Sequence, residues 1–251
     1  PYILLFLTIA LSMVLVIGCD LLEMDDPIDS LTNPLLRVFR GRLTYPAGET
    51  PYELLVGDLN QDGLLDVVTL DWAAESASVL LADGAGDFAE PSAYDLGGSP
   101  RAAVLQDLNG DNILDLAVVN EEHAQVTLLL GDGTGALTAS SVLQLTEDAA
   151  PRAIAAADLN NDGIMDLVTA ESATFTVTLH IGEGAGAFLE PLSLPPLEHA
   201  PSEILARDVT GDGIVDIVVA IPDNDTLALF AGTGMESLPA QVLSCGDMPQ
   251  L

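Results

Sequence analysis

The chain has little of what nucleic-acid binding, disulfide scaffolds or sugar stacking require. Its 251 residues hold six Lys and Arg against 39 Asp and Glu, a formal net charge of −33, and all six basic residues are arginine. Such a chain repels phosphates, so nucleic acid is excluded as a partner. Two cysteines cannot form a disulfide framework. Aromatic residues make up 4%, which is low for a protein that stacks on sugars.

Candidate catalytic groups are equally sparse. His123, His180 and His199 occupy no common place in the repeat described below, so we expect each to be an ordinary surface or loop residue. No nucleophile elbow and no HExxH motif stands out. The sequence therefore predicts that these residues form no enzyme active site.

What the chain does contain is one acidic nonapeptide, repeated four times. The copies begin at Asp58, Asp107, Asp158 and Asp208, which lie 49, 51 and 50 residues apart. A constant period of this size indicates a repeat architecture, in which each unit buries its apolar face against its neighbours.

The oxygen spacing of the nonapeptide favours calcium. Positions 1, 3, 5 and 9 carry side-chain oxygens, position 7 is aliphatic and offers a backbone carbonyl, and position 6 needs a left-handed turn. Oxygen-only ligation suits Ca²⁺ better than Mg²⁺, and the absence of His and Cys argues against zinc. We expect up to four structural Ca²⁺ ions. Their ligands would be Asp58, Asn60, Asp62, Leu64 and Asp66; Asp107, Asn109, Asp111, Ile113 and Asp115; Asp158, Asn160, Asp162, Ile164 and Asp166; and Asp208, Thr210, Asp212, Ile214 and Asp216.

Two alternatives to this interpretation exist. An EF-hand needs a bidentate Glu at position 12 and flanking helices, but that position holds Thr or Val, and β-branched runs such as Val67-Val68-Thr69 follow each loop. The other alternative, acidic turns without metal, is made improbable by the fourfold recurrence. Thr210, in place of Asn, makes the fourth site the weakest.

The first 34 residues predict export. Residues 1–18 are apolar or small and uncharged, and Gly18-Cys19 is followed by an acidic stretch. This resembles a bacterial lipoprotein signal peptide, with Cys19 becoming the lipidated residue. An uncleaved anchor and a buried helix are the alternatives. Residues 19–34 read as an acidic tether, and the protein is expected on the cell envelope, held to a membrane by lipid.

From residue 35 the pattern is all-β. A proline precedes a first strand that enters the acidic loop, a second strand follows, and a third ends at a Gly-rich turn such as Gly84-Ala85-Gly86. A fourth, for example Phe88–Pro91 or Phe188–Pro191, closes the unit. Four short strands per period of about fifty residues predict β-propeller blades. The predicted repeats are 51–99, 100–150, 151–200 and 201–248, after a blade-closing strand within 35–50.

This frame, with Asp-Leu-Asn-x-Asp-Gly-x-x-Asp and Gly-x-Gly-x-Gly-x-Phe-x-x-Pro at its centre, resembles the FG-GAP/VCBS repeat over residues 35–251. It is similar to the calcium-bearing blades of integrin α-subunit propellers and of many bacterial surface proteins. The resemblance implies a four-bladed fragment of a larger ring of about seven blades. Asn112 for Gly, Thr210 for Asn, and a fourth Gly turn without its Phe depart from the pattern.

The predicted function is a surface binding or adhesion module whose partner is a protein or a glycan. The alternative is the propeller portion of an extracellular enzyme acting on polysaccharide or lipid. Because strands alternate in direction, acidic loops and Gly turns should share one face, and the loops between strands 2 and 3 the other. Variable loops on a rigid frame favour a ligand site there, and we expect Trp72 and Glu122 to contribute to it.

Overall fold

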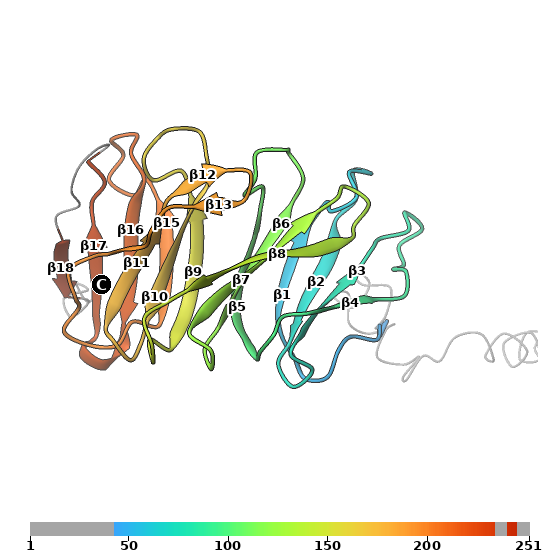
Figure 1. The fold of residues 1–251 in the computed structure, drawn as a ribbon, viewed down its shortest axis with the longest axis horizontal. Helices are drawn as coiled ribbons and strands as arrows, with labels where there is room; N and C mark the ends of the chain where they lie inside the picture. Colours follow the sequence, from blue (N-terminus) through green and yellow to red (C-terminus); the bar gives the residue numbers. More distant parts are fainter. Residues whose placement is uncertain (1–42, 234–239, 245–251) are drawn as a thin grey trace, which may run out of the picture. The chain divides into compact units, whose positions relative to one another are not determined.

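A computed structural model describes residues 43–233 and 240–244. All of its strands lie in the compact unit Pro46–Leu251, and all but one short hairpin form antiparallel four-stranded sheets, here called blades 1 to 4 (Figure 1). Blade 1 is β1 (Pro51–Gly57), β2 (Asp66–Asp71), β3 (Ser76–Leu80) and β4 (Ser92–Asp95); blade 2 is β5 (Pro100–Gln106), β6 (Asp115–Asn120), β7 (Gln125–Gly131) and β8 (Leu137–Gln144); blade 3 is β9 (Pro151–Ala157), β10 (Asp166–Glu171), β11 (Thr176–His180) and β14 (Leu192–Ser193); and blade 4 is β15 (Glu203–Arg207), β16 (Asp216–Ile221), β17 (Thr226–Phe230) and β18 (Ala240–Ser244). The predicted all-β class with four-stranded antiparallel sheets is thus confirmed.

Several predicted features fall outside this part of the chain. The signal peptide 1–18, Cys19, the tether 19–34 and Cys245 lie outside the described residues. Of the segment 35–50, residues 43–50 are described, and they form no strand. Within the described ranges, no helix has the length and apolar character needed to cross a membrane.

The second strand of each blade is largely buried. All six residues of β6 and all six of β10 are buried, because each strand has a hydrogen-bonded neighbour on both edges and a packed layer on both faces. A strand covered on both faces reads as a continuous run of β-branched and aliphatic residues rather than as an alternation. This is why Leu116-Ala117-Val118-Val119 lacks a polar face.

Successive blades pack through alternate residues of these strands. Val68 and Leu70 of β2 share one core cluster with Leu116 and Val118 of β6. The intervening residues of β6, among them Ala117, join the next cluster together with Ile154 and Leu167 of blade 3. Each blade therefore uses one face for the preceding blade and the other for the following one, and burial of each large aliphatic side chain contributes about 1.5–3 kcal/mol.

The first and last blades each keep one apolar face exposed. Leu54 of β1 is 69% exposed, whereas Ala103 and Ile154, which take the same place in β5 and β9, are each 7% exposed against the preceding blade. On the opposite side of blade 4, Val209 is 49% exposed, while its equivalent Leu59 is 1% exposed against blade 2. The exposed face of blade 1 thus corresponds to the face that each later blade packs against the preceding blade. The exposed face of blade 4 corresponds to the face that each earlier blade packs against the following blade.

The fourth strands differ from the prediction. In blade 1, Phe88 forms an isolated bridge with Ala82, and the strand that joins the sheet is β4, which begins at Ser92. In blade 3, β12 (Gly182–Gly184) and β13 (Ala187–Phe188) form a separate small hairpin, and the sheet resumes at Leu192. The predicted strands at 88–91 and 188–191 are therefore wrong, because the Gly-rich turn closes on itself and the chain returns to the sheet only after Pro91 and Pro191.

The residue that ends each second strand also differs from the prediction. Asp71, Asn120 and Glu171, expected at the start of variable loops, are instead buried strand ends with 0%, 0% and 1% exposure. The Thr69 and Ser78 hydroxyls donate to Asp71 at 2.8 and 2.6 Å, whereas the Asn120 amide nitrogen donates to the Leu96 carbonyl at 3.2 Å and to the Thr127 hydroxyl at 2.8 Å. The fourth blade has Ile221 at this place. The buried polar residue at the end of the second strand therefore differs among these three blades: it is Asp71, Asn120 or Glu171.

Blade 3 holds the most elaborate of these polar groups. Thr169, Thr176 and Thr178 donate hydrogen bonds to the Glu171 carboxyl, while burial raises the pKa of that carboxyl. His180, expected in a loop or on the surface, is 1% exposed on β11, with its Nε2 3.3 Å from the Thr169 hydroxyl. That expectation is wrong. Burial lowers the pKa of His180 from 6.5 to about 4, because the charged imidazolium loses its hydration.

The lowered pKa of His180 predicts a loss of stability in acid. Between pH 6.5 and about 4 the unfolded chain binds more protons at this residue than the folded chain, so the free energy of unfolding falls as the pH falls through this window. At pH 5 the loss relative to pH 7 should be about 2 kcal/mol. Denaturant unfolding of the natural chain and of His180→Leu at both pH values measures it. The raised pKa of Glu171 acts in the opposite direction, but equally in both proteins.

The matched control for this measurement is His123→Gln, because His123 is exposed. The control should keep the full acid loss, whereas His180→Leu should lose about 2 kcal/mol less than the natural chain. Equal pH dependence of His180→Leu and His123→Gln would contradict the assignment.

Candidate functional site

Each acidic loop is folded around its first aspartate. In the first loop, the two carboxylate oxygens of Asp58 accept the backbone N–H of Asp62 at 3.1 Å and of Gly63 at 2.9 Å. Asp107, Asp158 and Asp208 accept the equivalent N–H of position 6 at 2.7, 2.8 and 2.9 Å. The loop is therefore a compact turn whose backbone donors point inward at position 1.

Two left-handed residues make this turn possible. Position 6 has a φ of 85° at Gly63 and 66° at Asn112, as its role requires. Position 4 is also left-handed, with a φ of 61° at Gln61 and at Asn161, which the sequence analysis missed. The signal was present, since this position holds Gln, Gly, Asn and Gly, and Gly and Asn adopt this conformation most readily.

Positions 3 and 5 are held together by hydrogen bonds. The Asn60 amide nitrogen donates to Asp62 Oδ2 at 2.9 Å, and Asn60 Oδ1 accepts the Asp62 N–H at 3.1 Å. Asn109 and Asn160 make the same pair of bonds to position 5 of their own loops. Thr210 makes no such side-chain bond to Asp212; its backbone N–H donates to Asp216 instead. The fourth loop consequently lacks one connection that the other three have.

Position 9 has a role in folding that the sequence did not show. The carboxylate of Asp66 is fully buried; one oxygen accepts the N–H of Leu59 at 3.0 Å, and the other accepts the N–H of Ala82 at 2.8 Å. Asp115, Asp166 and Asp216 make the same two bonds, to loop position 2 and to the residue that leaves the third strand. This carboxylate fastens the acidic loop to the Gly-rich turn, and we call it the latch aspartate.

The second and third loops carry electrostatic strain at their latch aspartates. Burial raises the pKa of the Asp115 carboxyl, and the charges of Asp111 and Asp107 raise it further, while the N–H groups of Gly131 and Leu108 oppose the rise. The pKa of Asp166 is raised for the same reasons. Three carboxylates in nine residues repel one another, and a cation offsets that repulsion.

The donor set fits a calcium ion, although the side chains form no ready cage. Every donor is an oxygen, and positions 1, 3 and 5 are accessible. Each oxygen of Asp58 accepts one N–H and keeps a lone pair, whereas Asp107 Oδ1 and Asp216 Oδ2 each accept two. Within the described residues, no three acidic, His or Cys side chains lie close enough to enclose a metal. The predicted ligands are therefore gathered in one turn per blade, while their metal occupancy stays a prediction.

Neighbouring loops on this face are also connected to one another. Gln61 Nε2 of the first loop donates to the Asn112 carbonyl of the second at 3.0 Å. The N–H of Ala185, in the Gly-rich turn of blade 3, donates to the Asn109 carbonyl of blade 2 at 3.0 Å. Acidic loops and Gly turns thus share one end of the sheets, as the strand alternation predicted, and form a connected layer.

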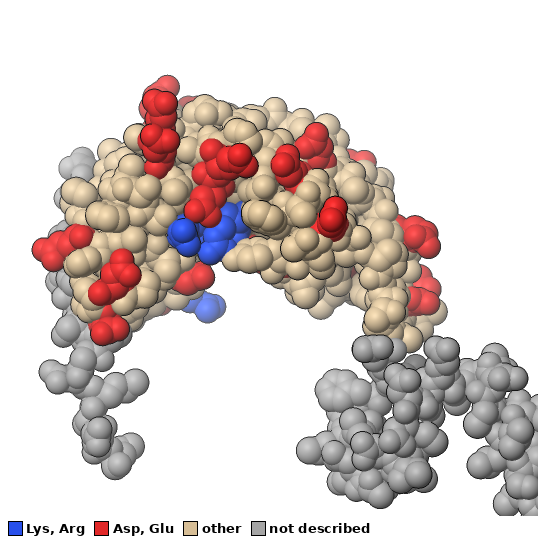
Figure 2. Space-filling model, turned by 90° about the horizontal axis from the view of Figure 1, so that it is seen from below, with Lys and Arg blue, Asp and Glu red and all other residues tan. Residues whose placement is uncertain are grey.

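The predicted ligand residues lie at the other end of the sheets. Trp72 is 52% exposed and follows β2 directly; Glu122 is exposed and lies two residues after β6. They belong to different blades, and no hydrogen bond joins them among the described contacts. The loops between second and third strands, together with the connections between blades, form what we call the lower face, seen in Figure 2.

A row of charged side chains crosses the lower face and was missed in the sequence. Arg101 lies over the Tyr52 ring at 5.1 Å, donates to the Tyr52 hydroxyl, and forms an ion pair with Glu121 at 3.5 Å. Arg152 reaches Glu121 from the next blade at 3.2 Å and donates to the Ser172 hydroxyl at 3.0 Å. Figure 2 shows the basic side chains gathered in a hollow of this face. The signal was the repeat itself, because Tyr52, Arg101 and Arg152 each follow a repeat proline.

Solved structures share this fold at low sequence identity. BBS1N in its complex with ARL6DN is 14% identical with a TM-score of 0.54, over 82% of this chain and 56% of its own. An Agrocybe aegerita lectin specific for non-reducing terminal N-acetylglucosamine is 20% identical with a TM-score of 0.55, over 76% and 51%. Virginiamycin B lyase from Staphylococcus aureus is 16% identical with a TM-score of 0.53, over 79% and 56%.

These neighbours are propeller-like, and the chain spans little more than half of the length of each. No curated protein matches the sequence. The FG-GAP-like repeat family model matches twice, at residues 58–118 and 107–169. Each match starts at the first aspartate of an acidic loop and extends past the next loop. Residues 58–169 therefore match the FG-GAP-like repeat.

Proposed function

We propose that this chain is a calcium-stabilised propeller module that binds a protein or glycan through its lower face. The observation that carries the proposal is the division of each blade into two ends. One end repeats the same loop and latch aspartate in all four blades, whereas the loops between the second and third strands at the other end differ in sequence from blade to blade. A repeated, connected end suits a scaffold, and a variable end on a rigid frame suits recognition. The proposal assigns no catalytic step to these residues.

Calcium is the cation that the loops would hold. Positions 1, 3, 5 and 9 and the carbonyl of position 7 supply five oxygens per loop, the number and type of donors that Ca²⁺ takes together with water. The ion would neutralise carboxylates that now repel one another across nine residues. Its role would be structural, since every potential ligand of one loop lies between the first and second strands of one blade.

The exposed end faces support a ring with further blades. Leu54 on blade 1 and Val209 on blade 4 occupy places that are buried at the junctions of blades 1 and 2 and of blades 2 and 3, and half-buried at the junction of blades 3 and 4. A blade of the same kind on each end face would bury them in the same way. A closed ring in projection images of the intact protein is the direct measure of this arrangement.

The first prediction here concerns metal. Adding Ca²⁺ to protein stripped with EGTA should raise the melting temperature, since an ion that binds only the folded state stabilises it by mass action, by about 2.7 kcal/mol per site at a hundred times its Kd. Asp111→Asn should reduce this calcium shift. Glu147→Gln removes an exposed acid outside the loops and should leave the shift intact. An unchanged melting temperature with Ca²⁺ would contradict the proposal. An equal rise in melting temperature with Mg²⁺ would contradict the selectivity of the loops for Ca²⁺.

The lipid anchor has its own measurement. We propose that Cys19 is the modified residue of an exported lipoprotein on the cell envelope, because it follows an apolar stretch that ends in Val16-Ile17-Gly18. Precursor expressed in a bacterium should incorporate labelled palmitate and lose residues 1–18, and Cys19→Ala should not label. Labelling that persists in the variant would contradict the assignment.

Recognition by the lower face is tested by paired substitutions. Labelled protein is applied to a glycan array and an extracellular-matrix protein array, and Trp72→Ala and Glu122→Ala are compared on the ligands found. Both should weaken binding, Trp72→Ala by about tenfold or more if it is a central anchor, with calcium-dependent melting unchanged. Glu183→Gln, an exposed change in a Gly-rich turn on the opposite face, should bind normally. The reverse pattern would place the site on the calcium-loop face.

A further inference from the structure

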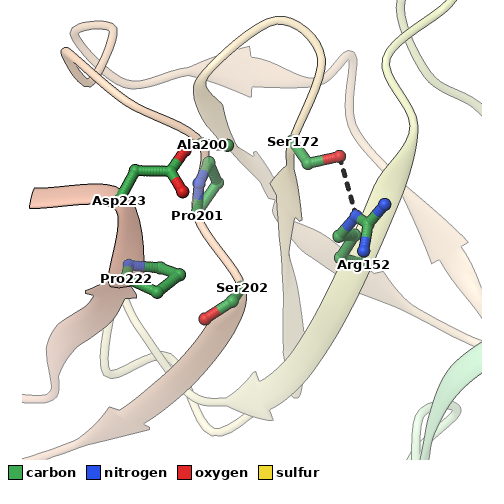
Figure 3. A pocket seen from close by; sticks show the side chains of 7 residues that line it. All are labelled: Arg152, Ser172, Ala200, Pro201, Ser202, Pro222 and Asp223. Atoms are coloured by element: carbon green, nitrogen blue, oxygen red, sulfur yellow. Dashed lines mark hydrogen bonds between the residues drawn. The ribbon is translucent and has the colours of Figure 1, made fainter.

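One hollow on the lower face lies at a junction between blades. A pocket of about 380 Å³ lies between blades 3 and 4 (Figure 3), a size within the usual range for small-molecule sites. It is lined by Arg152, Ser172, Ala200, Pro201, Ser202, Pro222 and Asp223.

The repeat explains why the pocket is there. At the junction of blades 1 and 2 the residue after the repeat proline is Arg101, which reaches back to Tyr52. At the junction of blades 2 and 3 it is Arg152, which reaches back to Glu121. At the junction of blades 3 and 4 it is Ser202, whose short side chain cannot span this distance. The space that an arginine fills elsewhere is therefore left open.

Arg152 presents a fixed cation to this space. Its Nε donates to the Ser172 hydroxyl at 3.0 Å and its Nη2 to Glu121 at 3.2 Å, which hold the guanidinium plane in place. These two bonds use two of its five N–H donors. The remaining donors form the planar arrangement that binds a carboxylate through two oxygens, and the side chain is 41% exposed.

The rest of the lining excludes a bare anion. Asp223, in the place that Glu122 takes in blade 2, brings a carboxylate that repels a second negative charge and needs hydrogen-bond donors. Ser172 and Ser202 offer hydroxyls, which donate or accept. Pro201 and Pro222 supply apolar ring surfaces. The lining thus fits a molecule with a negative group at one end, hydroxyl groups near it and an apolar C–H face.

From this lining we infer that the pocket binds a small polyhydroxylated carboxylate with the chemistry of a hexuronate, its carboxylate on Arg152 and its hydroxyls on Asp223 and the two serines. The inference rests on the proposed function, in that it gives the lower face a ligand class. It differs from that proposal in place, since Trp72 and Glu122 belong to blades 1 and 2.

The test uses the full 251-residue chain with Ca²⁺ and three probes: glucuronate, glucose and acetate. Isothermal titration or ligand-observed NMR should detect glucuronate, with at least about tenfold weaker binding of glucose, which lacks the carboxylate, and of acetate, which lacks the hydroxyls. Arg152→Gln should weaken glucuronate binding by about 10- to 100-fold. Arg207→Gln removes the same charge from β15, outside the pocket lining, and is the matched control that should bind normally.

Ser202→Arg is the second variant. It tests the pocket by filling it rather than by removing a contact to glucuronate. The new arginine should fill the pocket as Arg101 and Arg152 fill theirs, so the chain should stay folded with an unchanged melting temperature while glucuronate binding is lost. Glucose or acetate binding as tightly as glucuronate would overturn the inference, and so would full binding by Ser202→Arg. Absence of glucuronate binding by a protein whose calcium shift is intact would also overturn it, while leaving the calcium proposal standing.

Discussion

The latch aspartate is the interaction on which each blade depends. It begins the second strand, is fully buried, and its two oxygens take backbone N–H groups from both neighbouring connections of the same end. Because the second strand lies between the first and third, a carboxylate at its start can fasten both loops at once. Loss of that carboxylate would leave two backbone donors without partners, and each buried unsatisfied donor costs about 1–3 kcal/mol. The latch aspartate recurs at intervals near fifty residues and makes the same two bonds in each of blades 1 to 4.

Packing between blades follows from the same repetition. Strand residues alternate between the two faces of a sheet, so a period that keeps the register also keeps the forward and backward rows of apolar side chains. Small and medium residues such as Ala103, Ala117 and Val118 fill the space between sheets. The scarcity of aromatic residues is consistent with this close approach of sheets. Since each interface repeats the last, stability grows by nearest-neighbour contributions, and the two end faces stay apolar.

The sequence predicted the repeat unit but missed several side-chain roles, the place of the fourth strand and some left-handed residues. The four-strand unit, the β class and the common face of acidic loops and Gly turns followed from spacing alone. The latch role of position 9 was hidden because Asp66 reads equally well as a metal ligand, and only the structure shows its two N–H partners. The fourth strand was misplaced because the Phe88 segment looks like a strand but pairs with its own turn. Left-handed residues such as Ala124 and Phe175, with φ of 45° and 57°, could not be predicted, since neither residue type favours that conformation.

The lower face shows how a strongly acidic chain can still offer a site for an anion. The net charge of −33 acts over the whole surface, but at physiological ionic strength charges farther away than about 8 Å are largely screened. Within the row and the pocket, Arg101 and Arg152 stand against Glu121 and Asp223, so these groups are balanced in number. Glu121 is shared by both arginines, which orients each guanidinium, and Arg152 also lines the pocket. Such a site discriminates by hydrogen-bond geometry, because the surrounding acids repel highly charged anions and the balanced lining still accepts one carboxylate.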